Sequence, residues 1–304
     1  MAARRAAPLI VGSLRSLLAF LLVLGATVVA PGAIAARWVA DDVQDRAAFV
    51  DLVAPLADDP DLRVRLADAT ADAVIARVQA QLGVQVPARV GDLARTAART
   101  VTTGEQFPPF WKQAAADLHR QVLAVLDAEP GSPERRGDVV IDVGPLLSQV
   151  LLLLSEQGVP VVGATDAQVE VPVIARARIA QAEPTYRDVD TLTTWVPVLW
   201  LGLVALAVIV ANGLAGRLRT AGAALLGLAL GGLLVVLGSG PVGDEAVAQA
   251  RLGQEELARL LVDRVVDALG PYAGGRALLA LVAGLLLLVG GALAARRDRS
   301  TPAV

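Results

Sequence analysis

The side chains best suited to chemistry lie between Trp111 and His119. His119 is the single histidine of the chain, and Asp117 and Trp111 stand two and eight residues before it. Histidine titrates near physiological pH, so this cluster is the strongest candidate for a functional site. Hydrolysis would need a nucleophile, and metal binding would need further ligands, and the sequence shows neither in a recognisable arrangement. We therefore expect a structural role for the cluster, with no catalytic residue, no metal and no cofactor.

Two groups of aspartates offer carboxylates for a cation site or an acid-base pair. They are Asp41, Asp42 and Asp45 in the first group, and Asp58, Asp59 and Asp61 in the second. Both groups lack the glycine and the terminal glutamate of a calcium loop, and both stand where a helix start favours negative charge. We expect them to cap helices and to aid solubility. No phosphate-binding loop, kinase signature, nucleophile elbow or zinc-protease helix occurs, so the sequence predicts a protein that is not an enzyme.

The elements that must position these residues belong to a membrane protein. Of the 304 residues, 55% are hydrophobic and 19% are charged, no cysteine occurs, and the mean hydropathy is +0.58. Soluble domains usually carry about 25% charged residues. This composition excludes a disordered tail, a disulfide-stapled secreted domain and a nucleic-acid binder.

Four long uncharged runs predict membrane-spanning helices, because a charge at the bilayer centre costs at least ~2.5 kcal/mol. The runs cover residues 16–36, 191–216, 220–243 and 277–295. The predicted spans are about 16–36, 193–215, 220–239 and 277–295, and each can cross a hydrocarbon core of about 30 Å. The sequence Ala33-Ile34-Ala35 also resembles a signal-peptidase site. A cleaved signal peptide is therefore the alternative to a retained first span.

The distribution of charge predicts the orientation. Residues 37–190 and 244–276 carry net charges of −8 and −2, whereas the remaining charged segments are basic. The basic residues are Arg4, Arg5 and Arg15, then Arg217 and Arg219 in the turn between the second and third spans, then Arg296, Arg297 and Arg299. The positive-inside bias places these segments and both termini in the cytoplasm. We expect Trp38, Trp195 and Tyr272 to anchor the outer ends of the spans in the interface of the cytoplasmic membrane.

Residues 38–190 are long enough to form an extracytoplasmic domain with its own core. The patterns predict helices over 41–57, 60–82, 91–101, 109–126 and 146–157, strands over 139–143 and 169–174, and a helix over 175–192 that enters the second span. The outer segment 244–276 is amphipathic, with an apolar stripe of Leu257, Leu260, Leu261, Val265 and Leu269. We expect this stripe to dock on the larger domain or on the membrane surface.

The spans themselves hold few hydrogen-bonding side chains beyond Asn212, which argues against a transport path within them. In the third span Ala223, Gly227 and Gly231 repeat a small residue every four positions. This repeat predicts close helix packing, either within the bundle or in a dimer.

The residues that follow the first span resemble those of a family of uncharacterised actinobacterial integral membrane proteins. The resemblance lies in Trp38, Val43, Asp45, Phe49, Val50, Val53, Pro55-Leu56-Ala57 and Asp59-Pro60, in Trp111 with His119, and in Ile141-Asp142-Val143 with Pro145. It implies one span, an extracytoplasmic helical domain and three further spans. The chain departs from the family pattern at Ala115 and Ala116, where an Asn-Arg pair is expected. The family brings no known activity.

Together these features predict a mostly α-helical membrane protein with four transmembrane helices and a small β element in its outer domain. The expected function is non-enzymatic binding or scaffolding in the cell envelope, with the lipid bilayer and another envelope protein or a second copy as partners. The cytoplasmic segments are too short to bind nucleotide or nucleic acid. The alternatives are an accessory membrane subunit of a transporter or secretion system, and an extracytoplasmic enzyme or sensor that uses His119.

Overall fold

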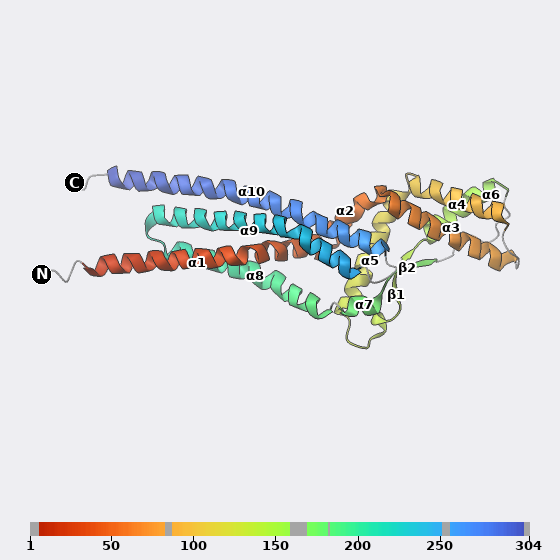
Figure 1. The fold of residues 1–304 in the computed structure, drawn as a ribbon, viewed down its shortest axis with the longest axis horizontal. Coiled ribbons are helices and arrows are strands. Elements are labelled where there is room, and N and C mark those ends of the chain that lie inside the picture. The colour runs from red at the N-terminus through yellow and green to blue at the C-terminus, as the bar shows by residue number, and fades with distance from the viewer. Residues whose placement is uncertain (1–5, 83–86, 159–168, 182, 251–255, 301–304) are drawn as a thin grey trace. The chain divides into compact units, whose positions relative to one another are not determined.

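The computed structural model describes residues 6–82, 87–158, 169–181, 183–250 and 256–300. It is mostly helical, and a two-stranded antiparallel sheet lies between spans one and two (Figure 1). Four helices contain stretches long and apolar enough to cross a membrane. These are α1 (Ala6–Trp38), α8 (Glu183–Val210), α9 (Gly213–Ala250) and α10 (Glu256–Ser300). The predicted fold class is confirmed, and the chain is a multi-pass membrane protein by helix length and composition.

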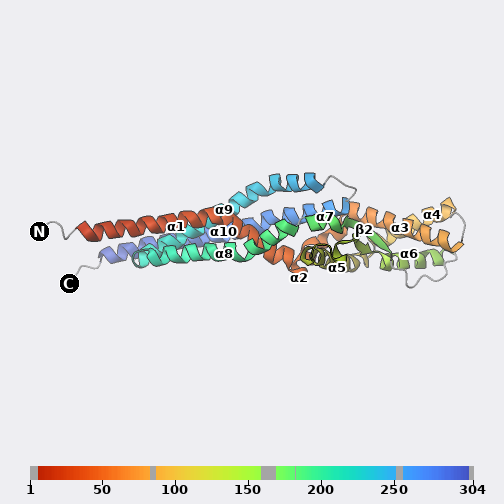
Figure 2. The ribbon, with the colours of Figure 1, turned by 90° about the horizontal axis from the view of Figure 1, so that it is seen from below.

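The chain divides into two compact units. The bundle unit comprises Met1–Asp41, Arg187–Ala246 and Val266–Val304, and the inserted unit comprises Asp42–Tyr186 and Val247–Val265. In the bundle unit the four long helices run side by side (Figures 1 and 2). The start of α1, the α8–α9 turn and the end of α10 lie at the same end of the bundle. We call this the turn end.

The turn between α8 and α9 lies earlier in the chain than predicted. The second span was expected to reach residue 215, with Arg217 and Arg219 in the turn, but α8 ends at Val210 and α9 begins at Gly213. Gly213 has φ +62°, a left-handed conformation that glycine adopts at little cost. The charge pattern missed this turn because its residues are uncharged. Both arginines therefore lie in the first turns of α9.

Glycines bring α9 into close contact with two neighbouring helices. A Cβ atom on Gly231 would lie 2.7 Å from Cβ of Ala30 in α1. A Cβ atom on Gly222 would lie 2.8 Å from the carbonyl oxygen of Gly284 in α10. Real Cβ contacts of this length essentially never occur. Glycine at these positions therefore lets the helix backbones approach more closely than any other residue would.

The described part of the inserted unit consists of helices of different lengths and the two-stranded sheet. Its elements in chain order are α2 (Arg46–Val53), η2 (Ala54–Asp58), α3 (Pro60–Leu82), α4 (Ala88–Thr103), α5 (Phe107–Asp127), η3 (Pro133–Arg135), β1 (Asp138–Asp142), α6 (Gly144–Glu156), β2 (Glu170–Ala175) and α7 (Arg176–Gln181), and the π-helical turn η1 (Val39–Gln44) joins α1 to them. The helix predicted over 41–57 is thus three pieces. Asp45 interrupts it, because its carboxylate caps α2 by accepting a hydrogen bond from the Ala48 N–H at 2.8 Å. Asp59 likewise accepts from the Leu62 N–H at 2.9 Å, so the expected capping is confirmed at both positions.

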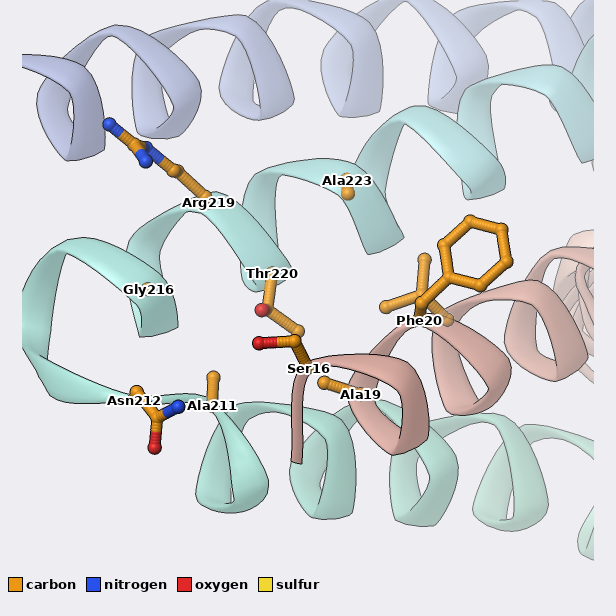
Figure 3. A pocket seen from close by; sticks show the side chains of 10 residues that line it. Ser16, Ala19, Phe20, Ala211, Asn212, Gly216, Arg219, Thr220 and Ala223 are labelled. Carbon is orange, nitrogen blue, oxygen red and sulfur yellow. The ribbon is translucent and has the colours of Figure 1, made fainter. Parts of the chain in front are cut away.

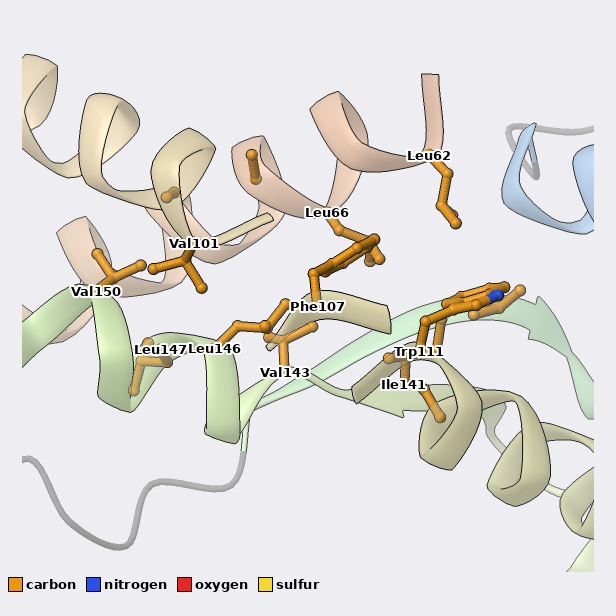
Figure 4. Packing of buried hydrophobic residues seen from close by; sticks show 14 of the residues in the cluster. Leu62, Leu66, Val101, Phe107, Trp111, Ile141, Val143, Leu146, Leu147 and Val150 are labelled. Atoms are coloured by element: carbon orange, nitrogen blue, oxygen red, sulfur yellow. The ribbon is translucent and has the colours of Figure 1, made fainter. Parts of the chain in front are cut away.

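The core of the inserted unit forms where α3, α5, α6 and β1 meet (Figure 4). Its largest fully buried side chains include Trp111, Phe107, Leu62 and Leu66. Side chains from the amphipathic start of α10 also pack against this core, namely Leu260, Leu261 and Val265. The expected docking of this stripe on the larger domain is therefore confirmed for these three residues, whereas the Leu257 side chain lies outside the described part of the chain.

A glutamine binds the edge of β1 that faces away from β2. Val143 and Gly137, at the two ends of β1, bond backbone atoms at the ends of β2, and backbone groups along an antiparallel strand alternate between its two edges. The N–H and carbonyl of Val140 therefore face the other edge. Gln121 of α5 satisfies both: its Nε2 donates to the Val140 carbonyl oxygen at 2.9 Å, and its Oε1 accepts from the Val140 N–H at 3.2 Å. Helix α5 is thereby joined to the sheet.

Candidate functional site

Trp111 occupies the centre of the predicted cluster and of the core. Its side chain is 1% exposed, and it follows Phe107 by one turn on the buried face of α5. The indole Nε1–H donates to the Val53 carbonyl oxygen at 2.9 Å. Because Val53 is the last residue of α2, the indole satisfies a carbonyl near a helix end. Trp111 therefore fixes the end of α2 to α5.

His119 contacts the same chain segment as Trp111 does, at Val43 and Phe49. Its Nε2 lies 2.9 Å from the Val43 carbonyl oxygen, and its ring centroid lies 4.8 Å from that of Phe49. A carbonyl only accepts hydrogen bonds, so Nε2 carries the proton and donates it. The side chain is 7% exposed. His119 is thus buried between a backbone carbonyl and an aromatic ring, and both contacts hold its side chain against η1 and α2.

Asp117 does not join the other two residues. Its carboxylate lies 2.9 Å from Nη2 of Arg120 and accepts hydrogen bonds of 3.3 Å from Nε2 of Gln113, both on α5. Trp111 and His119 therefore both contact the segment formed by η1 and α2, whereas Asp117 contacts only other residues of α5. The arrangement can fasten the chain that follows the first span to the core. Any binding role of these residues stays a prediction.

The structure reveals a polar cluster that the sequence did not predict. Asp41, expected to cap a helix or to aid solubility, lies in the π-helical turn after α1, and its Oδ1 is 2.7 Å from Nη2 of Arg37. Its Oδ2 accepts a hydrogen bond from the Tyr272 hydroxyl at 3.0 Å and lies 3.7 Å from Nη2 of Arg276. The Arg276 guanidinium also stacks 3.3 Å above the centre of the Tyr272 ring. This cluster joins α1 to α10.

The three predicted interface anchors have different environments. Trp195 of α8 is 64% exposed, which suits a ring that contacts lipid. Trp38 is buried at the end of α1, and the Tyr272 hydroxyl is bonded to Asp41. Their placement at a membrane interface stays a prediction.

The small residues of α9 lie on its contact face with α1. Gly231 packs against Ala30, and Gly227 packs directly against Thr27. Ala223, one turn before Gly227, lines a pocket between the two helices instead. Their assignment as a functional packing motif stays a prediction.

An open pocket of about 360 Å³ lies at the turn end of the bundle unit (Figure 3). It is bounded by α1, the α8–α9 turn and the first turns of α9. Its lining residues are Ser16, Ala19, Phe20, Val23, Ala211, Asn212, Gly216, Arg219, Thr220 and Ala223. Asn212 of the turn and Arg219 and Ala223 of α9 are conspicuous in the sequence, but no sequence signal joins them to Ser16 and Phe20 of α1. Elsewhere, the described residues contain no group of three acidic or histidine side chains that could hold a metal ion.

Comparison of the chain with family models, with curated proteins and with solved structures found no match. The resemblance to the actinobacterial membrane-protein family stays a prediction.

Proposed function

We propose that this multi-pass membrane protein is a non-enzymatic binding or scaffold protein of the cell envelope, with the inserted unit displayed outside the cytoplasmic membrane. The observation that carries the proposal is the self-contained core of the inserted unit. Phe107 and Trp111 are fully buried there, and the hydrogen bonds of Trp111 and His119 also run within the unit. A chain that builds such a unit mainly between its first two spans can present a folded surface on one side of the membrane.

The charge pattern supports an outward position of the inserted unit. The turn end gathers the start of α1, the α8–α9 turn and the end of α10, which carry Arg15, Arg217, Arg219, Arg296 and Arg297. Residues 37–190 carry a net charge of −8. The positive-inside bias favours the cytoplasm for the basic end. The close fit of Gly227 and Gly231 to α1 supports a first span that is retained as part of the bundle.

Labelling of single cysteines tests the orientation without background, because the natural chain contains no cysteine. We would introduce Glu105→Cys in the inserted unit and Asn212→Cys in the α8–α9 turn, since both side chains are exposed. A membrane-impermeant maleimide is expected to label Glu105→Cys in intact cells and Asn212→Cys only after permeabilisation. The natural chain serves as the unlabelled control. Labelling of Asn212→Cys alone in intact cells would show the reverse orientation.

Two exposed apolar side chains mark where a protein partner can be sought. Among the described residues of 42–186, Val64 of α3 and Leu152 of α6 are the large hydrophobic side chains that are exposed. Helices α3 and α6 contact one another, and we take these two positions as the candidate surface. Apolar side chains at the centre of an interface contribute most of its binding energy.

Photo-crosslinking in intact cells tests the binding proposal. A photoreactive amino acid would be placed at Val64 or Leu152, and at exposed Glu129 as the matched control. We expect a discrete crosslinked product at Val64 or Leu152 and none at Glu129, with the partner identified by mass spectrometry. A product that contains only this chain indicates self-association. A partner with transport motifs would favour the accessory-subunit alternative, and products of equal yield at all three positions would contradict specific binding through this surface.

A further inference from the structure

The pocket at the turn end has a polar part and an apolar part. Ser16, Asn212 and Thr220 bring two hydroxyls and an amide, whereas Phe20 and Val23 continue the pocket along α1 with apolar surface. In Figure 3 the hydroxyl groups of Ser16 and Thr220 face the same space between α1 and α9, and Phe20 lies farther from the turn. The pocket therefore matches a ligand with one polar end and one apolar end.

Three arginines lie at the turn end of the bundle unit, within one helical turn of polar lining residues of this pocket. Arg219 contributes to the lining and extends toward α10, where its Cγ packs so closely that a Cβ on Gly291 would lie 2.9 Å from it (Figure 3). Arg15 directly precedes Ser16, and Arg217 lies one turn before Thr220 on α9. The charges of these arginines attract an anionic group to the turn end, while the Thr220 hydroxyl and the Asn212 amide line the pocket and can donate hydrogen bonds to it.

We propose that this pocket binds an anionic phospholipid of the surrounding leaflet. The phosphate would accept hydrogen bonds from Asn212 and Thr220, and an acyl chain would lie against Phe20 and Val23. Helices α1 and α9 both contain candidate membrane spans, so lipid is the amphiphile present where the pocket opens. Basic pockets between transmembrane helices bind anionic headgroups in preference to zwitterionic ones. The proposal is independent of any partner of the inserted unit.

Native mass spectrometry of the full chain in mild detergent tests the proposal, with phosphatidylglycerol and phosphatidylcholine added at equal concentrations. We expect the protein to retain phosphatidylglycerol selectively. The double variant Ser16→Ala with Thr220→Val removes both hydroxyls of the lining without adding bulk, and it is expected to weaken retention by about tenfold, as the loss of a hydrogen bond from Thr220 to a charged group would. Thr191→Val, in α8 outside the pocket lining, is the matched control and should bind as the natural chain does.

A second variant and a competition experiment complete the test. Ala223→Leu fills the apolar part of the pocket without altering charge and should also reduce retention, so the conclusion does not depend on one variant folding. Soluble glycerol phosphate should not displace the lipid, because it lacks the acyl chain; displacement would show a phosphate site instead. Equal retention of both lipids, or unchanged retention in both the double variant and Ala223→Leu, would overturn the proposal.

Discussion

Replacement of Trp111 by alanine is expected to lower the free energy of unfolding of the inserted unit by about 3–5 kcal/mol. The indole is 1% exposed, and it packs in the core that also holds Phe107 and Leu66. Its removal leaves a large cavity, and it also leaves the Val53 carbonyl without its donor. Hydrogen exchange of the amides of α3 and α5, measured on the full chain in a lipid nanodisc, reports this loss as faster opening.

Two variants separate packing from hydrogen bonding at this site. Trp111→Phe keeps much of the apolar volume but cannot donate to Val53, so a smaller loss of about 1–3 kcal/mol is expected. Lys112→Ala changes the neighbouring exposed residue and should leave exchange within about 0.5 kcal/mol of the natural chain. If Trp111→Ala exchanged no faster than Lys112→Ala, the indole would not be a centre of the core.

Replacement of Gly222 by leucine is expected to destabilise the bundle unit by about 3 kcal/mol, through overpacking against α10. A Cβ on Gly222 would lie 2.8 Å from the Gly284 carbonyl oxygen and 3.1 Å from the backbone nitrogen of Leu288. Backbone atoms cannot swing aside as a side chain can, so the two helices must separate. The midpoint of thermal denaturation of the purified chain, followed by size-exclusion chromatography after heating, should fall.

The matched control is Gly290→Leu on α10. A Cβ on Gly290 meets nothing within 4 Å, so leucine there adds the same side chain without a clash. We expect its midpoint to stay near that of the natural chain. Equal midpoints for Gly222→Leu and Gly290→Leu would show that α9 and α10 do not cross closely at Gly222.

The sequence predicts the long helices of this protein, because they carry local signals, but it does not predict the division of residues 41–57 into η1, α2 and η2. Uncharged runs mark the four spans, and Asp59 with Pro60 marks the start of α3 as a cap followed by a first-turn proline. The α8–α9 turn has no such signal. Asn212 and Gly213 interrupt an apolar run without adding charge, so only the backbone conformation shows where one helix ends.

The candidate site could be predicted by residue type but not by contact. Trp111 and His119 are conspicuous because such side chains are rare in this chain, but their partners are the backbone carbonyls of Val53 and Val43, which any residue would present. The bond from Tyr272 to Asp41 spans 231 residues, and a single sequence contains nothing that links such distant positions.

Helix α10 belongs to both units, and this constrains the order in which the protein can be made. Its residues up to Val265 complete the core of the inserted unit, through Leu260, Leu261 and Val265, and its residues from Val266 onward belong to the bundle. A ribosome releases these residues only after the second and third spans have been synthesised. During translation this part of the apolar surface of the inserted unit therefore stays uncovered until the start of the last helix has been synthesised and packs against it.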